Sequence, residues 1–268
     1  MATQTTPPKP RLAVHKFTSC DGCQLALLNA GESLLQLAEL VDIVHFAEAG
    51  WLAGEEPVDI SIIEGSISTP DELVRIQKIR AQSRYLITIG ACATAGGIQA
   101  LRNAGHYSAW MASVYATPHT IQALDNATPI TDHVTVDCAL WGCPVNTGQV
   151  IDALRAILSG AAPKIKRDAV CLECKRRGQV CVMVTRQEPC MGPVTQTGCG
   201  ALCPSMHRGC YACYGPSENP NTIALGKRFQ EWGESTASIG QRYASINNQA
   251  PAFAKASQYF KGVRIVSE

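Results

Sequence analysis

Charged side chains, aromatic side chains and long apolar runs are all scarce in this chain of 268 residues. Charged residues make up 17% of it and aromatic residues 6%, and 23 Lys and Arg balance 22 Asp and Glu to a net charge of +1. A balance this close to zero gives no overall electrostatic attraction for nucleic acid or for an anionic membrane. Because hydrophobic residues reach 46%, we expect another subunit to cover some of the apolar surface.

Targeting and membrane-spanning signals are also missing from the sequence. No apolar run approaches the roughly 20 residues that a transmembrane helix needs. The first ten residues (MATQTTPPKP) have neither a basic start nor an apolar stretch, and no twin-arginine signal is present. We therefore expect a cytoplasmic protein with no direct membrane insertion.

Cysteine, in contrast, is abundant, with 13 in the chain. The cytoplasm keeps thiols reduced and a chain of this length needs no disulfides to fold, so metal binding is the leading interpretation. Eight of the 13 fall between residues 171 and 213. The six histidines are scattered, and none is assigned to a metal.

Short β-rich segments alternate with helical patterns over about the first 160 residues. This alternation predicts a doubly wound α/β domain built on a parallel sheet. Several of the expected strands are nearly all apolar, as strands buried on both faces should be. They cover residues 12–17, 41–47, 59–64, 85–89 and 134–136.

Three helices are expected between and after these strands. One covers residues 24–38 and carries an apolar face made by Leu25, Leu28 and Leu35. The second begins after Thr69, because Pro70 and Glu72 complete an N-terminal capping signal there. Its buried face should hold Leu73, Ile76 and Ile79. The third covers residues 149–158.

The alternation stops near residue 162, which divides the chain into residues 1–162 and 163–268. From residue 163 to 220 Cys, Gly and Pro dominate, so we expect bound inorganic groups to hold this irregular part together. A polar, helix-permissive tail follows. Its isolated aromatic anchors are Phe229, Trp232, Tyr243, Phe253, Tyr259 and Phe260.

Four cysteines directly follow the ends of predicted strands, and we call them the first set: Cys20, Cys23, Cys92 and Cys143. Ligands of open α/β sheets gather beyond the carboxyl ends of the strands, so one four-thiolate site is geometrically natural. The neighbouring glycines would let backbone amides approach the sulfurs; they are Gly22, Gly90 and Gly142.

Other interpretations of these cysteines stay open at this point. Zinc also suits a site of four cysteines. Taken singly, Cys92 and Cys143 could be small buried hydrophobic residues. Cys138 lies outside the set, and we expect it to pack inside and bind nothing.

The remaining eight cysteines are densely spaced and match the number that two [4Fe–4S] clusters need. Divided in sequence order, these eight cysteines form a second set and a third set. The second set is Cys171, Cys174, Cys181 and Cys190, and the third set is Cys199, Cys203, Cys210 and Cys213. An interleaved arrangement stays open. Two zinc ribbons would also use eight cysteines, and spacing alone does not choose the metal. Three four-thiolate sites in one chain nevertheless resemble a series of electron carriers.

A series of short motifs occurs in order along the chain. They are C-D-G-C at 20–23, E-G at 64–65, G-A-C-A at 90–93, G-C-P at 142–144, C-M-G-P-V-T followed by Cys199, and G-C-Y-A-C at 209–213. Over residues 12–216 this combination resembles the small subunit of a [NiFe]-hydrogenase.

The resemblance implies a flavodoxin-like domain that holds a proximal [4Fe–4S] cluster through the first set, followed by an irregular iron–sulfur cluster domain. There the third set would bind a medial cluster and the second set a distal one, both [4Fe–4S]. The NiFe centre belongs to a separate large subunit, so this chain would carry electrons and would hold no catalytic residue.

Two departures from the periplasmic pattern of that family matter. Cys171 stands where that pattern has His, so the distal site should be all-cysteine, and Cys203 stands where Pro is frequent, so the medial cluster should be [4Fe–4S] rather than [3Fe–4S]. With no export signal, the resemblance is to the cytoplasmic branch, which includes NAD(P)-linked and sulfhydrogenase-type enzymes. The expected partners are then the large subunit and flavin-containing and iron–sulfur NAD(P) reductase subunits. The acceptor stays open among NADP, NAD, ferredoxin and sulfur.

Two further features of the sequence lead to predictions, one for Glu64 and one for residues 164–177. The resemblance places Glu64 near the proximal cluster at the subunit contact, the alternative being an exposed carboxylate at a strand end. Residues 164–177 hold six basic and two acidic residues, a local charge of +4 beside the expected distal cluster. Such a run could steer an acidic redox partner or offset the charge of the cluster, or it could be a solvated face.

Two other classes of protein compete with this interpretation. A single-cluster subunit related to respiratory complex I shares the α/β domain and the G-C-P motif, but it typically has adjacent cysteines in place of C-x-x-C and lacks the eight-cysteine extension. A zinc-clipped scaffold would be colourless and free of acid-labile sulfide.

Overall fold

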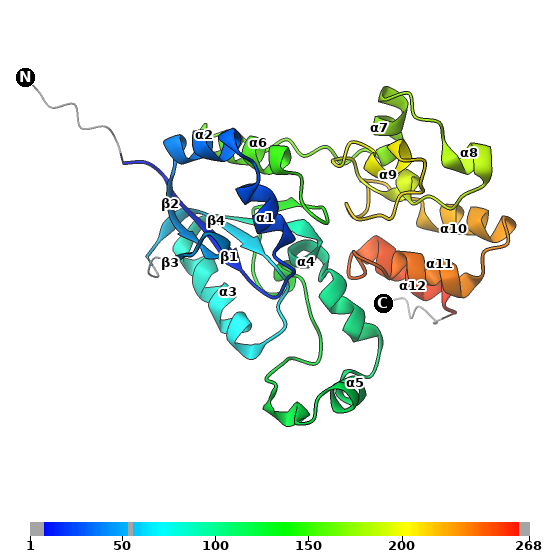
Figure 1. Ribbon diagram of the computed structural model, residues 1–268, viewed down its shortest axis with the longest axis horizontal. Coiled ribbons are helices and arrows are strands. Elements are labelled where there is room, and N and C mark those ends of the chain that lie inside the picture. Colours follow the sequence, from blue (N-terminus) through cyan, green and yellow to red (C-terminus); the bar gives the residue numbers. More distant parts are fainter. Residues whose placement is uncertain (1–7, 53–55, 263–268) are drawn as a thin grey trace, which may run out of the picture.

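The computed structural model describes residues 8–52 and 56–262. Its N-terminal part is one six-stranded sheet in the order β3-β2-β1-β4-β5-β6 (Figure 1). The strands are β1 (Arg11–Lys16), β2 (Asp42–Phe46), β3 (Trp51–Leu52), β4 (Val58–Glu64), β5 (Ser83–Ile89) and β6 (Cys138–Leu140). Neighbouring strands pair in parallel, except that β2 and β3 are antiparallel. Without β3 this is the flavodoxin-like strand order, which confirms the predicted doubly wound sheet.

Helices cover both faces of the sheet (Figure 1). On one face α1 (Gly22–Leu28), α2 (Glu32–Leu40) and α6 (Thr147–Leu158) pack on β1, β4 and β5. On the other face α3 (Pro70–Gln82) packs on the opposite side of β4 and β5. Burial on both faces explains the near-continuous apolar run of β4. Each fully buried isoleucine in these strands stabilises the fold by about 1.5–3 kcal/mol relative to an exposed one.

The predicted helix over residues 24–38 is wrong in its length and only partly right in its buried face. The structure has two helices instead, because the chain turns at Gly31, whose φ of +57° lies in the left-handed region that favours glycine. Leu28 packs against the core as predicted, but Leu25 and Leu35 are 47% and 68% exposed. The fully buried leucines are Leu27 and Leu37.

The capping signal at Thr69 is confirmed. The Thr69 hydroxyl accepts a hydrogen bond from the backbone N–H of Glu72, and the Glu72 carboxylate accepts one from the backbone N–H of Thr69. The predicted strand at 134–136 is displaced in the structure to Cys138–Leu140. Val134 and Val136 instead pack beside α3 as partly buried side chains, and Cys138 is buried in the core as predicted.

The C-terminal part is helical. Its helices are α7 (Val170–Arg176), α8 (Val182–Arg186), α9 (Leu202–Ser205), α10 (Thr222–Glu231), α11 (Thr236–Tyr243) and α12 (Pro251–Phe260). The N-terminal part has two further helices, α4 (Gly90–Ala95) and α5 (Tyr107–Val114). Short 3-10 helices are η1 (Ala47–Ala49), η2 (Ile98–Ala104), η3 (Pro118–Thr120), η4 (Ile130–Asp132) and η5 (Gly192–Val194). No helix in the ranges described is long and apolar enough to cross a bilayer.

The expectation that bound inorganic groups hold residues 163–220 together stays a prediction, but apolar packing also holds the C-terminal part together. Its cysteine-rich loops pack on α10, α11 and α12 around an apolar core of their own. Four of the predicted aromatic anchors are buried in it: Phe229, Tyr243, Phe253 and Phe260. Trp232 packs at the edge of this core, whereas Tyr259 is 47% exposed. The domain boundary at residue 162 stays a prediction.

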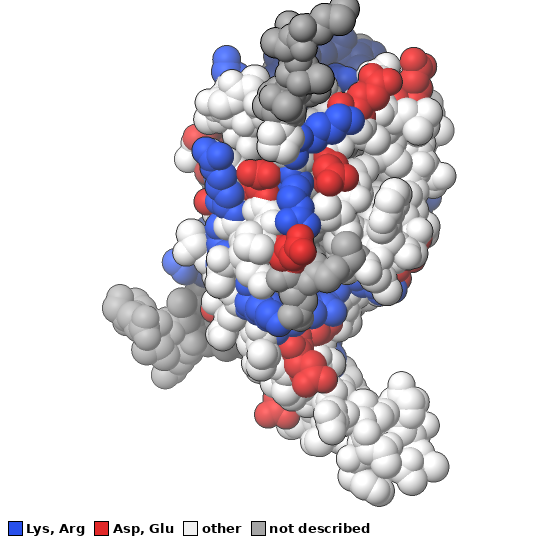
Figure 2. Space-filling model, turned by 90° about the vertical axis from the view of Figure 1, so that its left-hand side faces the viewer, with Lys and Arg blue, Asp and Glu red and all other residues white. Residues whose placement is uncertain are grey.

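The segment from η2 to η3 forms an arm that projects from the sheet (Figure 1). None of the residues of α5 is buried. Residues 103–124 contain no Lys, Arg, Asp or Glu, and the lobe at the lower end of Figure 2 is correspondingly free of charged side chains. The arm therefore exposes apolar side chains such as Trp110 and Val114, which are 49% and 72% exposed.

Candidate metal centres

The first set of cysteines lies beyond the carboxyl ends of the parallel strands, as predicted. Cys20 follows β1, Cys23 is in the first turn of α1, Cys92 is in α4 directly after β5, and Cys143 follows β6. The thiols interact with one another. Burial raises the pKa of Cys92 to about 12, and repulsion from Cys143 and Cys20 contributes to that rise. The structure thus brings four thiols from three strand ends to one place.

Glycines hold the main chain against two of these sulfurs. A Cβ atom at Gly90 would come within 2.4 Å of the Cys23 Sγ, and one at Gly97 within 2.6 Å of the Cys92 Sγ. A side chain at either position would collide with the thiol. A Cβ atom at Gly142 would instead meet the carbonyl oxygen of Pro144 and the ring of Tyr214, so the predicted role of Gly142 beside a sulfur stays a prediction.

Glu64, the last residue of β4, is buried, with 2% of its surface exposed. Its Oε1 accepts a hydrogen bond from the backbone N–H of Cys23 at 2.9 Å, and its Oε2 accepts one from that of Gln24 at 3.1 Å. The carboxylate thus satisfies two free amides at the start of α1 and fixes the main chain that carries Cys23. The alternative of an exposed carboxylate is wrong, while its contact with a partner subunit stays a prediction.

The second set is carried by two short helices. Cys171 and Cys174 lie in α7, Cys181 caps α8, and Cys190 precedes η5. Burial raises the pKa of Cys171 to about 11, and repulsion from the other three thiols of this set adds to the rise. These neighbours favour the grouping in sequence order.

The third set surrounds α9 and the G-C-Y-A-C segment. Burial raises the pKa of Cys213 to about 12, with further repulsion from Cys199, Cys203 and Cys143. Cys210 lies between two sets. Its backbone N–H donates to the Cys190 Sγ at 3.1 Å, and its own raised pKa, due first to burial, includes repulsion from both Cys190 and Cys213. The choice between sequential and interleaved ligation therefore stays open at Cys210.

The third set interacts with both other sets. Burial raises the pKa of Cys213, and repulsion from Cys143 of the first set adds to the rise. Burial likewise raises the pKa of Cys174 in the second set, with a smaller contribution from Cys199 of the third set. The order of the three sets as proximal, medial and distal stays a prediction.

Two residues that sequence reasoning missed connect these sets. Tyr214 is 5% exposed, and its hydroxyl donates to the carbonyl oxygen of Pro144 at 3.3 Å. Its pKa is raised by burial and then by the thiolates of the first and third sets. Glu173 of α7 accepts hydrogen bonds from the backbone N–H groups of Gly198 and Ala201, both at 3.0 Å, and so holds the loop of the third set. Neither role has a local signal, since each partner is at least 25 residues away.

The number and chemistry of these thiols fit iron–sulfur clusters. Burial raises most of their pKa values, and a bound cationic metal would favour the deprotonated, ligating form. Within the described residues, no group of three His, Cys, Asp or Glu side chains is arranged to hold a metal ion. Four thiolates suit zinc as well as a [4Fe–4S] cluster, so the identity of the metal is a proposal.

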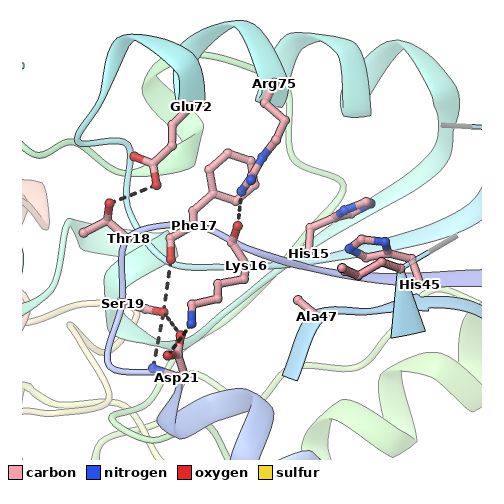
Figure 3. Close-up of a pocket in the computed structure, with 11 residues that line it drawn as sticks. His15, Lys16, Phe17, Thr18, Ser19, Asp21, His45, Ala47, Glu72 and Arg75 are labelled. Carbon is pink, nitrogen blue, oxygen red and sulfur yellow. Dashed lines mark hydrogen bonds and ion pairs between the residues drawn. The ribbon is translucent and has the colours of Figure 1, made fainter. Parts of the chain in front are cut away.

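A cavity of about 520 Å³ lies between β1, β2 and α3, and no cysteine lines it (Figure 3). Its polar groups are paired with one another. Lys16 forms an ion pair with Asp21 at 2.7 Å, Thr18 donates to Glu72 at 2.9 Å, and Arg75 donates to the main-chain oxygen of Lys16. These pairs therefore stabilise the loop before Cys20, and we assign no ligand to the cavity.

Known proteins resemble both parts of the chain. The family described as NADH ubiquinone oxidoreductase, 20 Kd subunit, matches residues 20–157. The sulfhydrogenase 2 subunit delta of Pyrococcus furiosus is 38% identical over 221 residues, which cover 82% of this chain and 92% of that protein. This similarity is longer than the family match and therefore extends beyond it.

Solved structures agree with this similarity. A chain of the NAD+-reducing [NiFe]-hydrogenase in its H2-reduced state aligns with a TM-score of 0.54 and 26% identity, covering 59% of this chain and 95% of that one. The actinobacterial-type NiFe-hydrogenase of Ralstonia eutropha H16 aligns with a TM-score of 0.56 over 95% of this chain and 90% of that one. At 16% identity the second match shows the fold alone.

The family match covers half of the chain, and the sulfhydrogenase relative covers most of it. The single-cluster alternative does not explain a similarity that continues past the α/β part. The chain belongs to the family of the 20 Kd subunit of NADH ubiquinone oxidoreductase and, within it, is the small subunit of a [NiFe]-hydrogenase.

Proposed function

We propose that this chain relays electrons between the NiFe centre of a large subunit and a flavoprotein that uses NAD(P), or a ferredoxin, through three [4Fe–4S] clusters. The first set would hold the proximal cluster, the third set the medial cluster and the second set the distal cluster. We propose a cytoplasmic location for the complex. The name of the NAD+-reducing neighbour supports a nicotinamide-linked partner.

The presence of three sets of four thiols, with the third set interacting with both others, is the observation that carries this proposal. Bound clusters would supply one-electron redox chemistry at each site. Three of the twelve thiols are buried, seven are partly exposed, and Cys20 and Cys181 are exposed.

The protein's own groups also set the electrostatic surroundings of each site. At the first set, the backbone N–H of Val145 lies 3.4 Å from the Cys23 Sγ and donates to it. Backbone donors of this kind stabilise a negatively charged cluster and raise its reduction potential. The nearby Glu64 carboxylate acts in the opposite direction.

The substitution Cys210→Ser, made in the assembled hydrogenase, tests the proposal. We expect electron transfer from H2 to the natural acceptor to slow far more than hydrogen–deuterium exchange at the large subunit. Iron analysis of the variant would report how many clusters remain. Cys138→Ala is the matched control, since Cys138 is a buried thiol outside the three sets. Equal losses of exchange and acceptor reduction in Cys210→Ser would contradict a relay role.

A zinc-clipped scaffold is the alternative function. It would hold four sulfurs around each zinc ion and would contain no acid-labile sulfide, so metal and sulfide analysis separates it from the relay.

A further inference from the structure

An exposed basic surface lies beside the second set. It consists of Lys164, Lys166, Arg167, Lys175, Arg176 and Arg177, all of which are exposed. Residues 164–210 contain eight basic and three acidic residues, a net charge of +5. Because the whole chain carries +1, the remaining residues carry −4. The positive charge is therefore concentrated around the two cluster sites of the C-terminal part.

The three acidic residues of this segment are outnumbered by its eight basic residues, so the surface stays positive. Asp168 is exposed beside Arg167, Glu173 accepts hydrogen bonds from two backbone N–H groups, and Glu188 pairs with Arg186 at 3.0 Å. Among the described residues, none of the six basic side chains forms an ion pair with a carboxylate. The surface keeps its charge available for a partner.

Apolar side chains are exposed next to these charges. Val180 and Val184 are 59% and 81% exposed, on either side of the exposed Cys181. An apolar centre with a polar, charged rim is the usual composition of a protein docking site. Charge on the rim mainly raises the rate of association with an oppositely charged partner.

The position of this surface agrees with an exit at the second set. α7 and α8 lie at the end of the molecule remote from β2 and β3 (Figure 1). Two thiols of the three sets are exposed, Cys20 of the first set and Cys181 of the second set. Cys181 lies at the start of α8, next to the exposed Val180, so a carrier bound over α7 and α8 would meet the second set.

We propose that the basic surface, with Val180 and Val184 at its centre, docks an acidic electron-carrier protein that exchanges electrons with the second set. This inference rests on the proposed relay function and adds the exit site and the charge of the partner. One electron passes from the cluster of the second set to the oxidised carrier, so the cluster is oxidised as the carrier is reduced. No bond forms or breaks in that step.

The test compares two acceptors with the purified hydrogenase complex under H2. One is an acidic [2Fe–2S] ferredoxin and the other is a neutral quinone. In the wild-type complex we expect the second-order rate with the ferredoxin to fall as salt is added, and the rate with the quinone to stay constant. In the double variant Lys166→Glu/Arg176→Glu the ferredoxin rate at low salt should fall about tenfold or more, with less than about a twofold change for the quinone.

Lys227→Glu provides the matched control, because Lys227 is an exposed cation in α10, outside the basic surface. It should leave the ferredoxin rate nearly unchanged. The proposal is overturned if the double variant loses both rates equally, which would mean that the cations only offset the charge of the clusters. An unchanged ferredoxin rate, or an equal loss in Lys227→Glu, would also overturn it.

This experiment distinguishes a result that contradicts the relay function from one that contradicts only the docking site. A complex without clusters, or one that reduces neither acceptor, would contradict the relay function itself. A complex that reduces the quinone normally but shows no charge effect with the ferredoxin would contradict only the docking site.

Discussion

Glu64 places a buried carboxylate beside the thiols of the first set. Its negative charge contributes to the raised pKa values of Cys23 and Cys92, behind the larger effect of burial. Reduction adds negative charge to a cluster, so a nearby carboxylate opposes it. The side chain has two effects here, since it also fixes the main chain of Cys23 through a hydrogen bond.

The substitution Glu64→Gln should make the potential of the proximal cluster more positive, by on the order of tens of millivolts, because it removes the charge and keeps one hydrogen-bond acceptor. A redox titration followed by electron paramagnetic resonance measures the shift. Glu32→Gln, at an exposed position in the first turn of α2, is the control and should leave the potential unchanged. A more negative potential in Glu64→Gln would contradict the electrostatic argument.

Tyr214 fills the space between the first and third sets. Its ring lies against Gly142 and Gly198, where a Cβ atom would come within 2.9 Å and 2.5 Å of it. We expect Tyr214→Ala to destabilise the fold by about 3–5 kcal/mol through the cavity that it leaves, and to lower the melting temperature by roughly 10 °C. Circular dichroism of protein prepared without air measures this change.

Tyr214→Phe separates the ring from the hydroxyl. It keeps the packing and loses one hydrogen bond, so the expected cost is about 1 kcal/mol. If Phe and Ala lowered the melting temperature equally, the hydroxyl rather than the ring would be the important group, and the packing argument would fail.

The sequence predicts which cysteines cluster much better than it predicts what holds them. Cysteines of the first set follow strand ends, and a parallel sheet brings strand ends together. Tyr214 and Glu173 give no such signal, because their partners are distant in sequence. The contact between Gly142 and the ring of Tyr214 gives no signal either, for the same reason.

Among the helices and strands, those with strong local signals match the predictions. The capping box at Thr69 locates the start of α3, and the apolar runs locate β4 and β5. Periodicity misjudges residues 24–38, because an apolar spacing continues across Gly31 although the chain turns there. The strand predicted at residues 134–136 begins later, at Cys138. Just before it, the Asp137 carboxylate pairs with Arg80 and accepts a hydrogen bond from the backbone N–H of Leu86, which aligns the chain with β5 from that point.

The arm around α5 differs from the other helices in having no buried residue. With few buried contacts, its local opening should cost little free energy. We expect the amides of residues 107–114 to exchange with deuterium much faster than those of α12, whose Phe253 and Phe260 are buried. Mass spectrometry of the isolated chain measures both segments. Equal protection of the two helices would contradict this prediction.

The molecule as a whole combines a flavodoxin-like sheet with a cysteine-rich part that has its own helical core. Two asparagines connect the parts at the cluster sites. Asn247 donates to the carbonyl oxygen of Ala212 beside the third set, and Asn248 donates to that of Gly97 beside the first set. The C-terminal tail, whose sequence is polar and carries no cluster motif, therefore supports the relay by fixing two sets against each other.

The content of iron, acid-labile sulfide and zinc in the full chain, purified without air, distinguishes three iron–sulfur clusters from zinc sites and from free thiols. Three cubanes predict about 12 iron atoms and about 12 sulfides per chain, four of each for every set of cysteines, with a brown colour that bleaches on reduction. Zinc without sulfide, or thiols free of any metal, would contradict the account.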